Sequence, residues 1–277
     1  MINKVSKSLK INGFLGTLFF IIRYFFSKIN ITIYEPIVQR QLALSAEINE
    51  LLHSTVAYGP FSGLKLSENI WWGKSDRANM LLGLYEKEIL DELIICSHDR
   101  ELFIDIGAAD GYFGIGVVYG GLFERSICYE MSSFGRELIR ETASKNGVLE
   151  RVKIFGVATK DFCKDFSDDD LKKAVVLMDI EGGEFDLLDL PTIKKLSKAI
   201  IYVELHDQFF PDGADKLKKL LNNLEKFFVV SEITTGARDL SCFSCLRNYS
   251  DNDRWLIASE SRPFLMTWLK LVPHRVG

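Results

Sequence analysis

The sequence predicts an α/β fold with a doubly wound, mostly parallel, seven-stranded sheet. Short apolar segments recur along the chain, for example at 102–106, 174–178 and 200–205, and helix-like segments separate them. Each of the three is followed by a glycine or a polar residue, which is typical of strands that deliver a binding site to one edge of a sheet. With 277 residues, of which 47% are hydrophobic, the chain is long enough for one substantial core.

The segment 102–106 is the central strand of this prediction. It is apolar apart from Asp105, as in a parallel strand that is covered on both faces. Gly107 and Gly111 then bracket a tight turn, and a helix is expected to begin at about Tyr112. The free backbone N–H groups at the start of that helix favour a small polar ligand, with Asp105 as its polar partner.

The remaining elements continue the alternation of strand and helix. Further strands are expected at 126–129, 152–157, 174–178, 200–205, 227–233 and 254–259. Helices are expected at 35–53, 76–95, 134–146 and 212–226. Asp76 is expected to cap the second helix, and the three acids at 168–170 to cap a short one. A short β excursion is expected at 64–66 and 70–72. Its two tryptophans are expected to serve in packing, and the alternative is that they line a pocket.

An acid, Glu130, follows the second strand, about twenty residues after the glycine turn, the distance at which an acid commonly binds ribose hydroxyls. Two strand ends therefore predict a nucleoside site at one edge of the sheet. The residues expected to bind this ligand are Asp105, Gly107, Ala108, Gly111, Tyr112, Glu130 and Asp179.

Two missing motifs indicate which nucleoside this is. Ala109 occupies the place of the second glycine in a dinucleotide fingerprint, and no lysine lies between Arg100 and Lys145 to complete a phosphate-binding loop. The ligand is therefore expected to lack phosphates and to carry a zwitterionic tail, as S-adenosylmethionine does. Two alternatives are a nicotinamide-dependent oxidoreductase, against which Ala109 argues, and a non-catalytic binding protein that retains the fold.

Several blocks of sequence occur in a fixed order between about residues 100 and 210. They are Asp-Ile-Gly-Ala-Ala-Asp-Gly-Tyr at 105–112, Tyr-Glu at 129–130, Leu-Met-Asp-Ile-Glu-Gly-Gly-Glu-Phe-Asp-Leu-Leu at 177–188 and Val-Glu-Leu-His at 203–206. In this order and spacing the blocks resemble the FkbM-type family of S-adenosylmethionine-dependent methyltransferases. The Asp-Ile-Glu-Gly-Gly-Glu block is the most specific of them. The family usually carries asparagine where this chain has Ala109, which removes one side-chain contact.

The resemblance implies a class I methyltransferase fold with an antiparallel last strand. It also implies O-methylation of a sugar or glycan hydroxyl, with S-adenosylmethionine as the methyl donor. A helix comparable to the one that carries Tyr85 and Glu86 precedes the glycine turn in FkbM-type proteins, so these two residues are expected to close over the cofactor.

Five polar residues follow the fourth and fifth strands and are expected at the same edge of the sheet: Asp179, Glu181, Glu184, Glu204 and His206. His206 is the expected general base, because the ordinary pKa of an imidazole lies near neutrality. Asp179 and Glu181 are expected to orient the acceptor for transfer, and Glu184 and Glu204 to bind it. One alternative is that Glu181 and Glu184 only cap the next helix. Another is a Mg²⁺ site formed by Asp179, Glu181 and His206, but no metal is assigned.

Composition excludes some classes of partner. The net charge of −4, from 34 basic and 38 acidic residues, gives no general attraction to nucleic acid. The five cysteines form no disulfide framework and are expected to be reduced, as in a cytoplasmic protein. Cys242 and Cys245 form a lone pair of the C-x-x-C type, and both are expected to be core cysteines rather than a zinc or redox site.

The chain is expected to divide into an N-terminal helical extension, 1–57, and a methyltransferase-type domain, 58–277, with its core at about 100–260. Residues 1–30 carry five basic residues and no acid. Their apolar run, 13–22, is shorter than the ~20 residues that span a membrane. A helix that packs on the domain or on a partner is expected there, and peripheral contact with the inner face of a membrane is the alternative.

Overall fold

The computed structural model describes residues 36–164, 166–262 and 265–274. The predictions made for residues 1–30, including their membrane contact, lie outside the described residues. The chain divides into two compact units, Met1–Ala43 and Leu44–Gly277, and helix α2 (Pro36–Leu51) runs across the division. Leu44 and Ile48 already belong to the core of the larger unit, which holds the sheet. Within the described ranges, no helix has the length and apolar character needed to cross a membrane.

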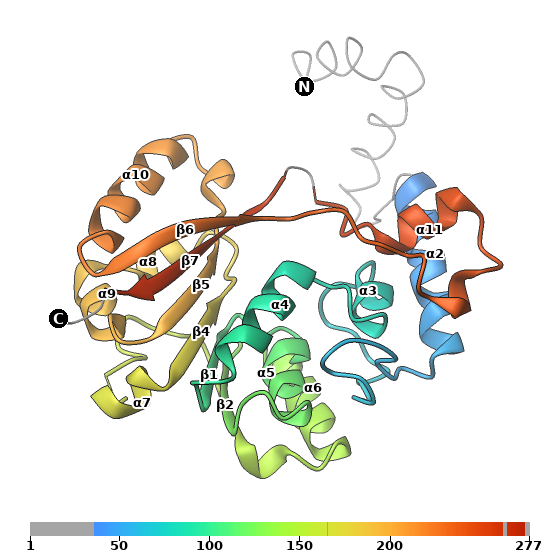
Figure 1. Cartoon of the computed structure of the whole chain (residues 1–277), viewed down its shortest axis with the longest axis horizontal. Helices are drawn as coiled ribbons and strands as arrows, with labels where there is room; N and C mark the ends of the chain where they lie inside the picture. Colours follow the sequence, from blue (N-terminus) through green and yellow to red (C-terminus); the bar gives the residue numbers. More distant parts are fainter. Residues whose placement is uncertain (1–35, 165, 263–264, 275–277) are drawn as a thin grey trace, which may run out of the picture. The chain divides into compact units, whose positions relative to one another are not determined.

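A seven-stranded sheet with the order β3-β2-β1-β4-β5-β7-β6 forms the centre of the larger unit (Figure 1). Its strands are β1 (Leu102–Ile106), β2 (Arg125–Tyr129), β3 (Val152–Phe155), β4 (Ala174–Met178), β5 (Ile200–Glu204), β6 (Phe228–Thr234) and β7 (Thr267–Pro273). Strands β1 to β5 pair in parallel, whereas β7 is antiparallel to both β5 and β6. This is the strand order of class I methyltransferases, and it confirms the predicted fold class.

The register of the central strands brings their carboxyl ends to one level. Ile106 pairs with Tyr129 of β2 and with Met178 of β4. The next residues along the three strands, Gly107, Glu130 and Asp179, therefore reach the same edge of the sheet. All five residues of β1 are buried, because strands flank it on both sides and helices cover both its faces.

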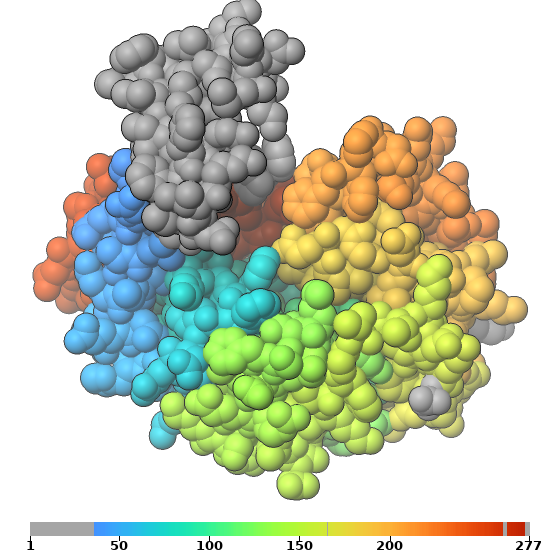
Figure 2. Space-filling model, turned by 180° about the vertical axis from the view of Figure 1, so that it is seen from behind, coloured from blue at the N-terminus to red at the C-terminus, as the bar shows by residue number. Residues whose placement is uncertain are grey.

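Helices cover both faces of the sheet (Figure 1). Side chains of β1 alternate between the two, so that Phe103 belongs to one apolar cluster and Ile104 to the other. The cluster with Phe103 includes residues of α3 (Arg77–Leu81), α4 (Lys87–Cys96), α5 (Tyr112–Tyr119), α6 (Ser133–Lys145) and α11 (Asp251–Ala258). The cluster with Ile104 includes residues of α7 (Asp168–Lys172), α8 (Glu184–Leu187), α9 (Leu190–Leu196) and α10 (Gly213–Leu224). Seen from behind, the green and yellow segments meet on one surface (Figure 2).

Several predicted elements are confirmed to within two residues, among them the helices α2, α6 and α10 and the strand β3. Local capping explains some of these boundaries. The Ser132 side chain accepts the Gly135 N–H at 3.2 Å and begins α6. In α7, Ser167 and Asp170 form a reciprocal capping box, so the acid cluster at 168–170 is structural, as expected. Short 3₁₀ helices complete the fold at Leu149–Arg151, Asp207–Phe209 and Ser244–Leu246.

The prediction of a strand at 254–259 is wrong. These residues lie in α11, which begins where the Ser250 side chain accepts the Asp253 N–H, with Asp251 also in the first turn. A short apolar run does not by itself distinguish a helix from a strand. The seventh strand is β7, further along the chain, where Trp268, Leu269 and Leu271 are buried.

The prediction of one helix over 76–95 is also wrong, because the chain turns between α3 and α4. Gly83 has φ +66°, and a Cβ there would lie 2.4 Å from the carbonyl oxygen of Tyr58, so no continuous helix fits. Asp76 precedes α3 but makes no side-chain capping hydrogen bond. Of the expected β excursion, only a bridge between Thr55 and Lys65 forms.

Candidate functional site

A cavity of about 540 Å³ lies at the carboxyl ends of β1, β2 and β4. This volume lies within the range that small-molecule sites occupy, and the position beside the reversal of strand order is where open α/β sheets bind ligands. The predicted site residues that line the cavity are Asp105, Gly107, Ala108, Tyr112, Glu130, Asp179 and Glu181. Gly111, Glu184, Glu204 and His206 are not among the lining residues.

The glycine turn is held by backbone contacts between the three strand ends. The Gly107 N–H donates to the Tyr129 carbonyl at 2.9 Å. Gly107 has φ +93°, and a Cβ on it would lie 1.8 Å from the carbonyl oxygen of Asp179. The backbone of the neighbouring strand end, rather than a ligand, therefore requires this glycine. Gly111, with φ +84°, turns the chain into α5.

Glu130 holds the far side of the same turn. Its carboxylate accepts the Ala109 N–H at 2.9 Å and the Ser132 N–H at 2.7 Å. Ala109 adopts φ +47°, a left-handed conformation that asparagine tolerates better than alanine. Each carboxylate oxygen has a second lone pair, so Glu130 can also accept hydrogen bonds from ligand hydroxyls in the cavity.

Asp105 is buried near the end of β1. The N–H of Gly114, in the first turn of α5, donates a hydrogen bond to its carboxyl. Burial raises the pKa of this carboxyl to about 7, and the nearby Glu130 adds to the rise, although the hydrogen bond from Gly114 opposes it. A Cβ on Gly114 would lie 2.9 Å from the carboxyl, so the close approach depends on that glycine. Asp105 therefore contributes a buried carboxyl to the lining of the cavity, and its raised pKa favours the protonated form.

We expect the free energy of unfolding of the wild type to fall relative to that of the Asp105→Asn variant as the pH rises from 5 to 8. The unfolded chain loses the Asp105 proton near pH 4, whereas the folded protein keeps it to about pH 7, so ionisation increasingly destabilises the wild-type fold over this range. Over two pH units of that range, the difference in free energy of unfolding between the two proteins should change by ~2–3 kcal/mol. Urea unfolding at both pH values measures the change, with Glu137→Gln on the exposed face of α6 as the control. A difference between Asp105→Asn and wild type that stays constant with pH would contradict the assignment.

Asp110 and two tryptophans were not among the predicted site residues, yet they line the cavity. The Asp110 carboxylate accepts the backbone N–H of Trp71 at 3.0 Å and that of Trp72 at 3.2 Å. Burial raises the pKa of Asp110 to about 6 despite these hydrogen bonds. The indole rings remain 45% and 46% exposed, although Trp71 packs edge-on against Phe134. Their place in the lining agrees with the alternative that neighbouring tryptophans line a pocket. The feature of the sequence that indicated this position was that Trp71 and Trp72 are neighbours.

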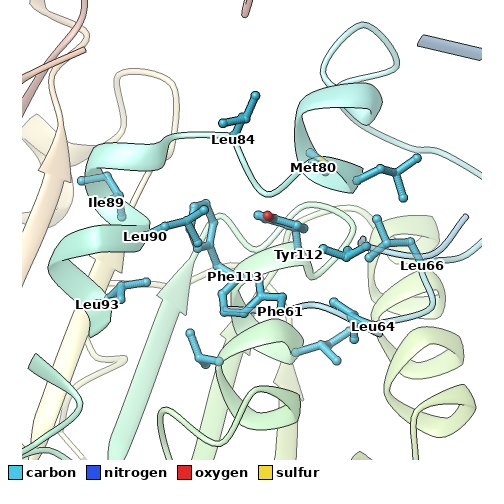
Figure 3. Close-up of a cluster of buried hydrophobic side chains, with 14 of the residues drawn as sticks. Phe61, Leu64, Leu66, Met80, Leu84, Ile89, Leu90, Leu93, Tyr112 and Phe113 are labelled. Atoms are coloured by element: carbon cyan, nitrogen blue, oxygen red, sulfur yellow. The ribbon is translucent and has the colours of Figure 1, made fainter. Parts of the chain in front are cut away.

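One wall of the cavity is aromatic. Tyr112 packs edge-on against Phe61, with ring centroids 5.2 Å apart, and against Tyr85 at 5.8 Å. Tyr112 lies with Phe113 among Phe61, Leu90 and Met80 (Figure 3). Its hydroxyl is buried without a hydrogen-bond partner among the described residues. Tyr85 and Glu86 also line the cavity. That they close over the cofactor stays a prediction.

The loop after β4 brings Asp179 and Glu181 to the opposite wall. Glu181 has φ +54°, and such strain in a residue other than glycine is often found at functional sites. Its side chain is 48% exposed. The adjoining Asp179 carboxyl is mostly buried, and burial together with the nearby Glu204 raises its pKa well above the ordinary value. This wall is acidic and differs from the aromatic wall across the cavity.

Glu184 and Glu204 do not occupy the substrate positions predicted for them. Glu184 is fully buried, and its carboxylate accepts the Gly182 N–H and the His206 N–H, both at 2.9 Å. It thereby joins the loop after β4 to the loop after β5, which is close to the structural alternative considered for it. Glu204 is also buried and forms an ion pair with Arg262. Both carboxylates stabilise the walls and do not face the cavity.

His206 does not have the neutral pKa expected of a general base. It is 2% exposed, and four carboxylates surround its ring at 3.4–3.7 Å: Asp179, Glu181, Glu184 and Glu204. Burial alone would lower the pKa, but hydrogen bonds with Glu184 and Glu204 and the attraction of Asp179 raise it to about 10. An imidazolium cannot accept a proton, and the ring does not line the cavity. The role of general base therefore stays a prediction, which these contacts do not favour.

The strand at β7 and the segment before it supply further residues that the sequence did not predict. Trp268 of β7 lines the cavity, and its indole N–H is buried without a partner among the described residues. Arg262 contacts three carboxylates, those of Glu204, of Glu86 at 2.7 Å and of Glu260 at 2.9 Å. These residues were missed because the last strand was expected at 254–259. The prediction that Cys242 lies in the core is also wrong, because this residue is exposed.

No family model matches this sequence, and no curated protein matches it. Solved structures resemble it in fold. WbdD has 12% sequence identity and a TM-score of 0.48 over 68% of this chain and 40% of its own. A putative O-methyltransferase from Klebsiella pneumoniae has 11% identity and a TM-score of 0.44 over 91% of this chain and 96% of its own.

A third structure is TYW2 from P. horikoshii in complex with MeSAdo, with 14% identity and a TM-score of 0.39 over 66% of this chain. The match spans 60% of the length of the TYW2 chain. At such low identity, these likenesses concern the fold alone and do not extend to activity.

Proposed function

We propose that this protein is an S-adenosylmethionine-dependent O-methyltransferase that acts on a hydroxyl group of a sugar or glycan. The observation that carries the proposal is the position of Glu130. Its carboxylate is fixed by two backbone N–H groups at the end of β2, beside the glycine turn and at the edge of the cavity. A fixed acid at this point of a doubly wound sheet suits the two hydroxyls of a ribose.

The surroundings of Glu130 fit the rest of the cofactor. Met131 and Val157 are exposed apolar residues that line the cavity near Glu130, and they offer a surface for the adenine ring. On the other side, the first turn of α5 and Asp105 provide backbone N–H groups and a carboxyl for a zwitterionic tail. When bound, the cofactor supplies a methyl group on a positively charged sulfur.

The acidic wall is the proposed acceptor side. An acceptor hydroxyl held there would take the methyl group that the cofactor supplies and would lose its proton to water or to a cavity carboxylate. Asp179 and Glu181 would bind and orient the acceptor hydroxyls. The sugar class rests on the resemblance of the 179–184 block to FkbM-type proteins, and the exposed indoles of Trp71 and Trp72 offer surfaces on which a sugar ring can stack.

We expect Glu130→Ala to weaken S-adenosylmethionine binding by roughly 10- to 150-fold, because hydrogen bonds to a charged acceptor contribute ~1.5–3 kcal/mol. Calorimetry with the full chain measures this, and Glu137→Ala on exposed α6 is the matched control. Thermal unfolding separates loss of binding from loss of fold, because Glu130 also holds the glycine turn. Native mass spectrometry of the purified protein tests for carried-over S-adenosylhomocysteine. Failure of the wild type to bind either compound, or undiminished binding by Glu130→Ala, would contradict the proposal.

A further inference from the structure

Three carboxylate oxygens and one imidazole nitrogen converge behind the acidic wall of the cavity. The Nε2 atom of His206 lies 3.4 Å from Glu204, 3.6 Å from Glu181 and 3.7 Å from Asp179. These distances exceed the ~2.7–2.9 Å of a charge-assisted N–H···O bond, so the hydrogen bond with Glu204 is a long one and the other two oxygens lie farther away.

The spacing of these atoms fits a shared metal ion. Asp179, Glu181 and His206 each offer one donor atom, and the three atoms lie within 4.8 Å of one another. Donor atoms about 2.0–2.2 Å from a common ion are separated by about 2.8–3.6 Å. The observed distances to Nε2 would therefore need to shorten only slightly. Glu204 does not belong to this group of three and instead forms a second one with Glu86 and Asp179.

Two further observations fit a cation at this position. The Asp179 oxygen that faces His206 is buried and has no hydrogen-bond partner among the described residues. The His206 side chain, 3% exposed, is directed at this oxygen. Within the described ranges, Asp179 and Glu181 pair with His206 and with no arginine or lysine. The fixed cation nearby, Arg262, is taken up by Glu86, Glu204 and Glu260.

The backbone favours this convergence. Glu181 adopts a left-handed conformation, and the buried Glu184 carboxylate ties the loop of Glu181 to the backbone of His206. The donors from the two loops are thereby fixed relative to one another before any ligand arrives. Such preorganisation lowers the cost of binding.

We propose that Asp179, Glu181 and His206 form a binding site for a divalent cation of the Mg²⁺ or Mn²⁺ type, because two of the three donor atoms are oxygens. A ligating imidazole must be neutral, so the ion would displace the proton of His206 as it binds. Asp179 and Glu181 also line the cavity, so the ion would reach it from the acidic wall. Its role there rests on the proposed function: it would bind the acceptor hydroxyl and favour loss of its proton to water before methyl transfer. The cation site itself does not depend on that activity.

The test uses Mn²⁺ alone, added to the full chain after treatment with EDTA and dialysis. Calorimetry and the electron paramagnetic resonance signal of free Mn²⁺ are expected to show one saturable site. Glu181→Gln, at a half-exposed position that tolerates substitution, and His206→Ala should each weaken binding at least about tenfold. Asp169→Asn is the matched control, because Asp169 belongs to the exposed acid cluster of α7 and should leave Mn²⁺ binding unchanged.

The outcomes separate this inference from the proposed function. Wild-type protein that binds S-adenosylmethionine in EDTA but shows no saturable Mn²⁺ site would overturn the cation site alone. Mn²⁺ binding that Asp169→Asn weakens as much as Glu181→Gln does would also overturn it, since that result indicates non-specific attraction to acids. Specific Mn²⁺ binding without cofactor binding would support the site and contradict the methyltransferase proposal.

Discussion

Gly107→Ala is expected to cause one of the largest losses of stability of any single substitution in this fold, at least about 4 kcal/mol. The new Cβ would lie 1.8 Å from the Asp179 carbonyl oxygen, so the ends of β1 and β4 would have to separate. The left-handed backbone, with φ +93°, adds ~1–2 kcal/mol of strain for any residue with a side chain. Denaturant unfolding of the purified variant measures the loss.

Gly147→Ala is the matched control for Gly107→Ala. Gly147 also has a positive φ, of +69°, but a Cβ there would meet nothing within 4 Å. The control should therefore lose only the ~1–2 kcal/mol of backbone strain. The difference between the two variants isolates the steric contact at the cavity. Equal losses in the two variants would show that the strand ends can move apart at little cost.

Arg262→Ala is expected to cost ~3–5 kcal/mol, because the substitution leaves buried carboxylates without their cation. Glu86 and Glu204 are both nearly inaccessible to solvent and lie on different elements, one at the start of α4 and one at the end of β5. Their repulsion would act directly on the wall of the cavity. The measurement is again denaturant unfolding.

The control for Arg262 is Arg254→Ala. Arg254 pairs with Asp251 on the surface of α11, where an ion pair contributes ~0–1 kcal/mol. A double variant, Arg262→Met with Glu86→Gln, should recover part of the lost stability, since it removes one unpaired charge. If Arg262→Ala unfolds no more easily than Arg254→Ala, the buried network does not stabilise this wall.

The sequence was sufficient to predict the parallel half of the sheet, because the signals there are local. Strands such as β1 and β4 are continuous apolar segments that a glycine or an acid follows at once. The antiparallel edge was harder to predict. The residues 254–259 are as apolar as a short strand, and the cap at Ser250 together with packing in the core makes them helical.

The candidate site was predictable only to the level of which residues reach the edge. Glu130 and Asp179 follow from strand ends, and both line the cavity. The environment of His206 depends on four acids from two loops, and the direction in which Glu184 points is set by backbone N–H groups far apart in sequence. Neither sequence spacing nor residue type reports such contacts. The pKa of His206 could therefore not be predicted.

The way in which Asp110 holds the segment with Trp71 and Trp72 has an evolutionary consequence. Asp110 binds the backbone N–H groups of residues 71 and 72 and makes no demand on their side chains. Any residue except proline, which lacks the N–H, can replace either tryptophan without loss of this tether. The side chains at positions 71 and 72 can thus vary while Asp110 and the backbone that it holds stay the same. Related proteins could therefore change the shape and polarity of the cavity's opening by substitution at these two positions alone.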